Sequence, residues 1–163
     1  MKKYNGYYII GVDAGYGNMK TAQSIFPTGL IALDADPMYK GNYLKYNGIW
    51  YRIGAGHKPF INDKTDDDEF YILTLASIAS ELNTVHVSTA DVLLAVGLPT
   101  TWTSYQREEY REYMLKNRDV KFTFNDVDYH IRFVDCMVFP QGYSAVVQSV
   151  DNDLKNNGFR IFS

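Results

Sequence analysis

An acidic residue and two closely spaced glycines near the start of the chain have types and spacing that suit phosphate chemistry. The apolar run Tyr7–Val12 predicts a short buried strand, and it ends at Asp13. Gly15 and Gly17 follow with one residue between them, and a second run, Lys20–Phe26, begins at once. A strand, a tight glycine turn and a returning strand together predict a β-hairpin.

Such a hairpin has the groups needed to bind a phosphate and a metal ion. The turn Gly15-Tyr16-Gly17 would expose successive backbone N–H groups, which can cradle a phosphate. Asp13 is placed to hold a hydrated Mg²⁺, an ion that keeps its waters and uses few protein carboxylates. Lys20 could add a positive charge. An ordinary hairpin, in which Asp13 caps the turn and Lys20 is solvated, fits the same pattern, so both interpretations stay open.

Composition limits the other possibilities. The 163 residues, 46% of them apolar and 21% charged, suit one ordinary soluble domain. The net charge of -3 argues against a nucleic-acid surface on the chain itself. Cys136 is the single cysteine, which excludes an internal disulfide and a cysteine zinc cluster. No apolar run approaches transmembrane length and the start is unlike a signal peptide, so we expect a cytoplasmic protein without membrane contact.

Strand and helix patterns alternate along the chain and predict an α/β fold. Residues 34–64 differ from the rest of the chain in composition, being rich in Gly, Asn, Tyr and Lys. They contain two short predicted strands around the turn Asn47-Gly48, so they are predicted to form a small inserted β-rich lobe. Residues 1–33 and 65–163 would form the core. Its later predicted elements are a helix after the acidic run 65–69, strand 91–96, helix 105–116, hairpin 120–124 and 127–133, strand 134–139, and a helix that Pro140-Gln141-Gly142 opens.

The pattern Asp13-x-Gly15-x-Gly17-x-x-Lys20 resembles the first phosphate loop of the actin superfamily, which includes DnaK-type chaperones and sugar kinases. The later segments, in order, resemble the N-terminal half of ParM-like bacterial actins. They are Ile53-Gly54-Ala55-Gly56-His57, Gly97-Leu98-Pro99 and Pro140-Gln141-Gly142. The resemblance covers nearly all of residues 7–163. It implies an actin-like (ribonuclease H-like) domain with a mixed sheet and helices, and a C-terminal half that this chain lacks.

The resemblance also implies roles for individual residues. Asp13 would hold Mg²⁺ through water, and Gln141 would be the catalytic residue that orients the attacking water. The phosphates of ATP or GTP would be bound by the residues of the turn and the returning strand: Gly15, Tyr16, Gly17, Asn18 and Lys20. Without the resemblance, Gln141 would be interpreted as an ordinary first-turn helix residue.

The implied function is a filament whose assembly is driven by nucleotide binding and which moves plasmid or phage DNA through an adaptor protein. The full-length parent would hydrolyse ATP or GTP, whereas this chain alone is expected to be inactive and to bind nucleotide weakly. A sugar-type kinase is the first alternative, but it needs a catalytic carboxylate, and the segment Gly97–Tyr105 contains none. A scaffold that keeps the fold without using nucleotide is the second alternative.

Overall fold

The fold is a single curved sheet with two helices packed against it, in a computed structural model that describes residues 1–56, 68–98 and 104–140. The described part of the sheet has ten strands: nine follow the order β4-β3-β2-β8-β10-β9-β6-β7-β5, and the tenth, β1, pairs with β2 beside this path. The helices are α1 (Glu69–Asn83) and α2 (Ser104–Met114). The strands are β1 (Lys2–Tyr4), β2 (Tyr7–Ala14), β3 (Asn18–Lys20), β4 (Ile25–Pro27), β5 (Leu30–Leu33), β6 (Tyr43–Tyr46), β7 (Ile49–Ile53), β8 (Thr89–Leu98), β9 (Asp119–Phe124) and β10 (Val127–Pro140).

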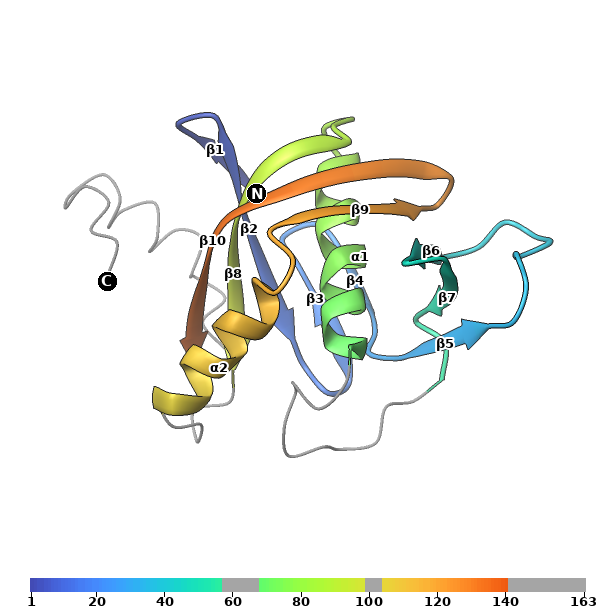
Figure 1. Cartoon of the computed structure of the whole chain (residues 1–163), viewed down its shortest axis with the longest axis horizontal. Coiled ribbons are helices and arrows are strands. Elements are labelled where there is room, and N and C mark those ends of the chain that lie inside the picture. Colours follow the sequence, from blue (N-terminus) through green and yellow to red (C-terminus); the bar gives the residue numbers. More distant parts are fainter. Residues whose placement is uncertain (57–67, 99–103, 141–163) are drawn as a thin grey trace.

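Three parallel strands form the centre of the sheet (Figure 1). Strand β8 lies between β2 and β10, and Val96 is in register with Val12 on one side and with Val138 on the other. Leu98, the last residue of β8, pairs with Pro140, the last residue of β10. The carboxyl ends of β2, β8 and β10 therefore meet at one edge. Strands β3 and β4 extend the sheet beyond β2 in antiparallel pairs, so the sheet is mixed, as predicted.

Helix α1 is buried on almost all sides because it lies against the inner face of this curved sheet (Figure 1). Phe70, Leu73, Leu75 and Ile78 are fully buried there. The buried hydroxyl of Thr74 donates to the carbonyl of Phe70 one turn earlier at 2.7 Å, so the helix has no unpaired hydroxyl at this position. A helix that is apolar all round is typical of such a central position.

The outer face of the central strands is apolar near their middle. Ile9 and Leu93 are fully buried on this face, and Tyr7, Met137 and Phe139 pack against them. Burial on both faces explains why β2 and β8 are near-continuous apolar runs instead of alternating ones.

Strands β5, β6 and β7 form an antiparallel group, which we call the lobe, in and just before the region predicted as an inserted lobe. Asn47 (φ 50°) and Gly48 (φ 81°) join β6 to β7, as the Asn-Gly pair predicts. Strand β6 also pairs with β9, since Leu44 lies opposite Phe124, so the lobe is continuous with the main sheet. Strand β5 belongs to this group by its pairing, although it precedes the predicted boundary at residue 34; a separate domain over 34–64 remains a prediction.

Two predicted strands have different bounds in the structure. The returning strand predicted over Lys20–Phe26 is divided into β3 and β4, because the chain turns between Thr21 and Ser24, whose backbone N–H and carbonyl bond at 2.8 Å. The buried carboxylate of Glu81 on α1 holds this turn by accepting from the N–H of Gln23 at 2.7 Å.

The strands predicted separately over 127–133 and 134–139 are one strand, β10, with a register shift between Phe133 and Asp135. A bulge of this kind bends a strand and inserts an unpaired residue. Among the described residues, no helix has the length and apolar character needed to cross a membrane.

Candidate functional site

The glycine turn lies at the edge where the three parallel strands end (Figure 1). Gly15, Tyr16 and Gly17 join the end of β2 to the start of β3, and Ala14 pairs with Met19 across the hairpin. Ligands of open α/β sheets bind beyond the carboxyl ends of such strands. The predicted hairpin is thus confirmed, and it stands at the edge of the sheet where a ligand site is expected.

Within the described part of the chain, hydrogen bonds from Gly15 and Thr28 hold the turn. The N–H of Gly15 donates to the carbonyl of Asn18 at 3.1 Å. Thr28 contributes two, because its hydroxyl donates to the carbonyl of Gly15 at 2.6 Å and its N–H donates to the carbonyl of Gly17 at 3.0 Å. Sequence reasoning did not single out Thr28, since nothing in the local pattern shows that it lies against a turn 13 residues earlier.

The N–H of Gly17 has no acceptor among the described residues. A Cβ added at Gly17 would meet nothing within 4 Å, so the space above this residue is open. Neither this space nor a positive φ requires a glycine for the turn itself. A glycine is therefore explained best by a group from outside the chain that approaches the backbone here.

Asp13 and Lys20 lie directly opposite each other on β2 and β3, so their side chains share one face of the sheet. Oδ1 of Asp13 is buried and has no hydrogen-bond partner. Lys20 is exposed and makes no ion pair with Asp13 or any other described residue. A buried carboxylate oxygen without a donor is costly, and a metal-bound water is one group that would satisfy it.

The residues at this edge fit a hydrated Mg²⁺ better than a metal held mainly by protein. No group of three or more His, Cys, Asp or Glu side chains gathers in the described part of the chain. Asp13 is thus the carboxylate at the turn, with a buried oxygen that can accept from coordinated water. Mg²⁺ commonly binds through one or two carboxylates, several waters and substrate phosphates.

Tyr16 and Asn18 differ in how their side chains lie. The ring of Tyr16 packs edge-on against Phe70 of α1, with 6.2 Å between centroids, so this side chain belongs to the core side of the sheet. Asn18 is exposed at the first position of β3. Any contact of Tyr16 with a phosphate would therefore come from its backbone. Gln141, which directly follows Pro140, lies outside the described residues.

Helix α2 is fixed to the middle of β10. A guanidinium nitrogen of Arg111, Nη2, donates to Oδ1 of Asp135 at 2.6 Å, and Nε donates to the carbonyl of Cys136 at 3.2 Å. Burial lowers the pKa of Arg111, but the hydrogen bonds and negative charges of Asp135 and Glu108 together raise it, and the net pKa lies above the ordinary value. Tyr110, which is fully buried, has its pKa raised well above the usual range by burial.

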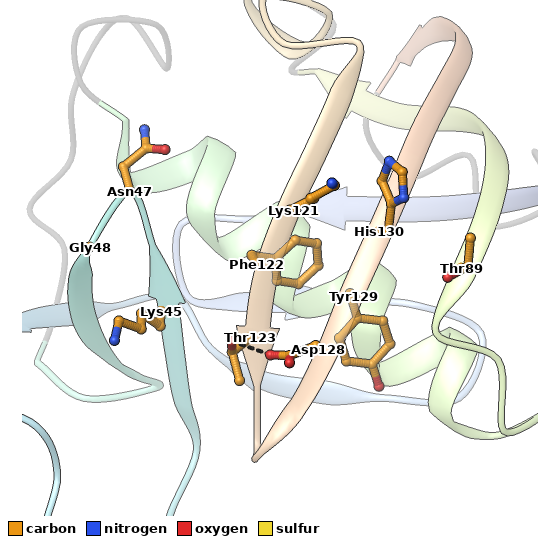
Figure 2. Close-up of a pocket in the computed structure, with 10 residues that line it drawn as sticks. All are labelled: Lys45, Asn47, Gly48, Thr89, Lys121, Phe122, Thr123, Asp128, Tyr129 and His130. Atoms are coloured by element: carbon orange, nitrogen blue, oxygen red, sulfur yellow. Dashed lines mark hydrogen bonds between the residues drawn. The ribbon is translucent and has the colours of Figure 1, made fainter.

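A separate hollow of about 500 Å³ lies far from the glycine turn, at the other end of the sheet. Its lining includes Thr89, the first residue of β8, together with the β6–β7 turn and the β9–β10 hairpin (Figure 2). Side chains pair with one another there, since Thr123 donates to Asp128 at 2.6 Å and His130 lies 2.8 Å from Asp119. None of the site residues predicted from the sequence lines this hollow.

Comparison with protein families finds one match that covers most of the chain. The model of the family described as actin-like proteins, N-terminal domain, matches residues 11–143. No curated protein matches the chain by sequence.

Solved structures with the same fold include bacterial and archaeal proteins. The apo pSK41 ParM protein superposes with a TM-score of 0.65 at 15% identity, over 84% of this chain and 50% of that one. An AlfA filament bound to AMPPNP superposes with a TM-score of 0.66 at 14% identity, over 86% of this chain and 56% of that one. Ta0583, an archaeal actin homologue in complex with ADP, superposes with a TM-score of 0.65 at 17% identity, over 90% of this chain and 47% of that one. The chain thus spans about half the length of the structures that it matches.

Proposed function

The chain belongs to the family of actin-like protein N-terminal domains, and we propose that it forms the first half of a nucleotide-binding site in a protein that polymerises into filaments. The glycine turn and Asp13 would hold the phosphate end of ATP or GTP. This proposal is supported by one observation above the others. A buried, unpartnered carboxylate oxygen and an N–H without an acceptor lie on the same hairpin, at the common carboxyl edge of β2, β8 and β10.

The residues of the hairpin have distinct roles in this proposal. The N–H of Gly17, together with the other backbone donors of the Gly15–Asn18 turn, would bind phosphate oxygens, and Lys20 would add a positive charge. Asp13 would hold Mg²⁺ through coordinated water, and the ion would neutralise negative charge on the phosphates. Gln141 would orient the attacking water, a role that depends on placement more than on acid–base strength.

The wider role that we propose is a filament that forms from full-length subunits in the cytoplasm and moves plasmid or phage DNA. The AlfA structure is a filament bound to AMPPNP, and this chain shares its fold. Contacts between identical subunits that do not close into a ring give open filaments. DNA would be bound through an adaptor protein, which agrees with a net charge of -3 on this chain. The second half of the full-length protein would supply the other side of the nucleotide site.

The test uses the complete protein that carries this domain and the substitution Asp13→Asn. AMPPNP binding in the presence of Mg²⁺, measured by calorimetry, is expected to weaken by about tenfold or more, because a charge-assisted contact to hydrated metal is lost. Sedimentation with ATP or GTP should show less polymer. Asp126→Asn is the matched control, since Asp126 is exposed in the β9–β10 turn at φ 64°, a conformation that Asn also accepts.

Equal affinity and equal sedimentation for wild type and Asp13→Asn would contradict the proposal. The same pair of measurements addresses the scaffold alternative, which expects polymer that does not depend on nucleotide.

A further inference from the structure

Thr28 is a buried hydroxyl residue between β4 and β5 that the hairpin pattern does not include. Its side chain is 1% exposed. Through the hydroxyl and the backbone N–H, it donates to two carbonyls of the glycine turn, those of Gly15 and Gly17. One residue thus bonds to both glycines of the predicted phosphate loop.

These bonds set the direction of the peptide planes in the turn. In a planar trans peptide the C=O and the following N–H point in opposite directions. Because the carbonyls of Gly15 and Gly17 point toward Thr28, the N–H groups of Tyr16 and Asn18 must point away from it. The N–H of Gly15 is fixed separately by the carbonyl of Asn18. The Tyr16–Gly17 peptide lies between the Gly15–Tyr16 and Gly17–Asn18 peptides, which Thr28 already orients. The direction of the Gly17 N–H is therefore restricted as well.

The neighbouring residue connects this network to the inserted lobe. The carbonyl of Gly29 accepts from the N–H of Gly54, just after β7, at 2.8 Å. The backbones are so close that a Cβ at Gly29 would lie 2.6 Å from the carbonyl oxygen of Gly56 and 2.8 Å from that of Ala55. The pair Thr28-Gly29 therefore bonds to the glycine turn through one residue and contacts the end of the lobe through the next.

We propose that Thr28 is a positioning residue: it holds the glycine turn in the conformation that binds phosphate and links that turn to the inserted lobe. This inference rests on the proposed function and deepens it. A turn whose donors are already aimed loses little conformational entropy when the ligand binds. Without the Thr28 hydroxyl, the Gly15 carbonyl lacks its buried donor and the turn samples other conformations.

The test compares Thr28→Val with Thr28→Ser in the complete protein. Valine keeps the shape and removes the hydroxyl, whereas serine keeps the hydroxyl. We expect Thr28→Val to weaken AMPPNP binding by about tenfold, the effect of one buried hydrogen bond, and Thr28→Ser to stay within about twofold of wild type. Thr74→Val is the matched control, because Thr74 is also 1% exposed and its hydroxyl also donates to a backbone carbonyl, that of Phe70. It should lower stability without changing affinity.

Hydrogen exchange without nucleotide provides the second measurement. Peptides that cover residues 13–20 and 53–56 should exchange faster in Thr28→Val than in wild type or Thr28→Ser, while Thr74→Val leaves them unchanged. Unchanged exchange in Thr28→Val, or a loss of affinity in Thr28→Ser as large as in Thr28→Val, would overturn the inference. Failure of the wild-type protein to bind AMPPNP would instead overturn the proposed function, and the exchange data would still decide whether Thr28 holds the turn.

Discussion

At the scale of single residues, the site depends on what the hairpin leaves unsatisfied. Oδ1 of Asp13 is buried without a donor, and the N–H of Gly17 has no acceptor among the described residues. Native structures rarely leave such groups unpaired without a reason, and a bound ligand is a common one. The two groups have opposite hydrogen-bonding character, which suits a metal ion with its waters on one side and a phosphate oxygen on the other.

Gly17→Ala should separate binding from folding. A Cβ at this position meets nothing within 4 Å, and the φ of Gly17 is not positive, so we expect the free energy of unfolding to change by less than about 1 kcal/mol. The same methyl group would occupy the space in which a phosphate approaches the N–H, so AMPPNP affinity should fall by about tenfold or more. Chemical denaturation and calorimetry on the complete protein give the two quantities. Unchanged affinity would remove Gly17 from the site.

At the scale of elements, patterns of neighbouring residues predicted many of the strands and turns. They did not predict the contacts between residues that are far apart in the sequence. Asn47-Gly48 gives the β6–β7 turn, and the apolar run before Asp13 gives β2, because these depend on neighbouring residues only. Thr28 could not be predicted, since its partners are set by how β4 leads into β5. The turn after Lys20 is held by Glu81 on α1, a contact 58 residues away that no local pattern contains.

The bulge in β10 shows the same limit. The sequence favours two strands over 127–139, and the structure joins them because β10 keeps pairing with β8 on both sides of Val134. Whether a strand continues or stops is decided by its neighbours in the sheet, and register is a property of the pair. The residues of the candidate site were all proposed from the sequence except Thr28, and their roles in binding remain predictions.

The attachment of the lobe to the core provides a test at this scale. In Gly29→Ala the new methyl group would lie 2.6 Å from the backbone oxygen of Gly56, so one of the two segments must move. We expect the free energy of unfolding to fall by about 1–3 kcal/mol, the usual cost of overpacking. Gly48→Asn serves as a control, because Gly48 lies in an open turn at φ 81° and Asn tolerates a left-handed backbone best. Equal stability of Gly29→Ala and wild type would show that the lobe end is loosely attached.

At the scale of the whole molecule, this chain corresponds to about half of each structure compared above. The superpositions on the ParM, AlfA and Ta0583 structures include 84% to 90% of this chain but only 47% to 56% of each of those chains. Under the proposed function, the carboxyl edge of β2, β8 and β10 faces the second half of the full-length protein. This is why binding and assembly are to be measured on the complete protein, and why the isolated chain is expected to bind nucleotide weakly.

Whether the glycine turn binds phosphate is tested most directly by following the backbone amide of Gly17 during nucleotide binding. The complete protein, labelled with ¹⁵N-glycine, would be titrated with AMPPNP and Mg²⁺, and the Gly17→Ala variant would identify the resonance. We predict that this amide resonance shifts more than that of Gly48 in the β6–β7 turn and that its hydrogen exchange slows as the phosphate accepts from it. Nucleotide binding that leaves the Gly17 amide unchanged would show that the glycine turn does not bind the phosphate.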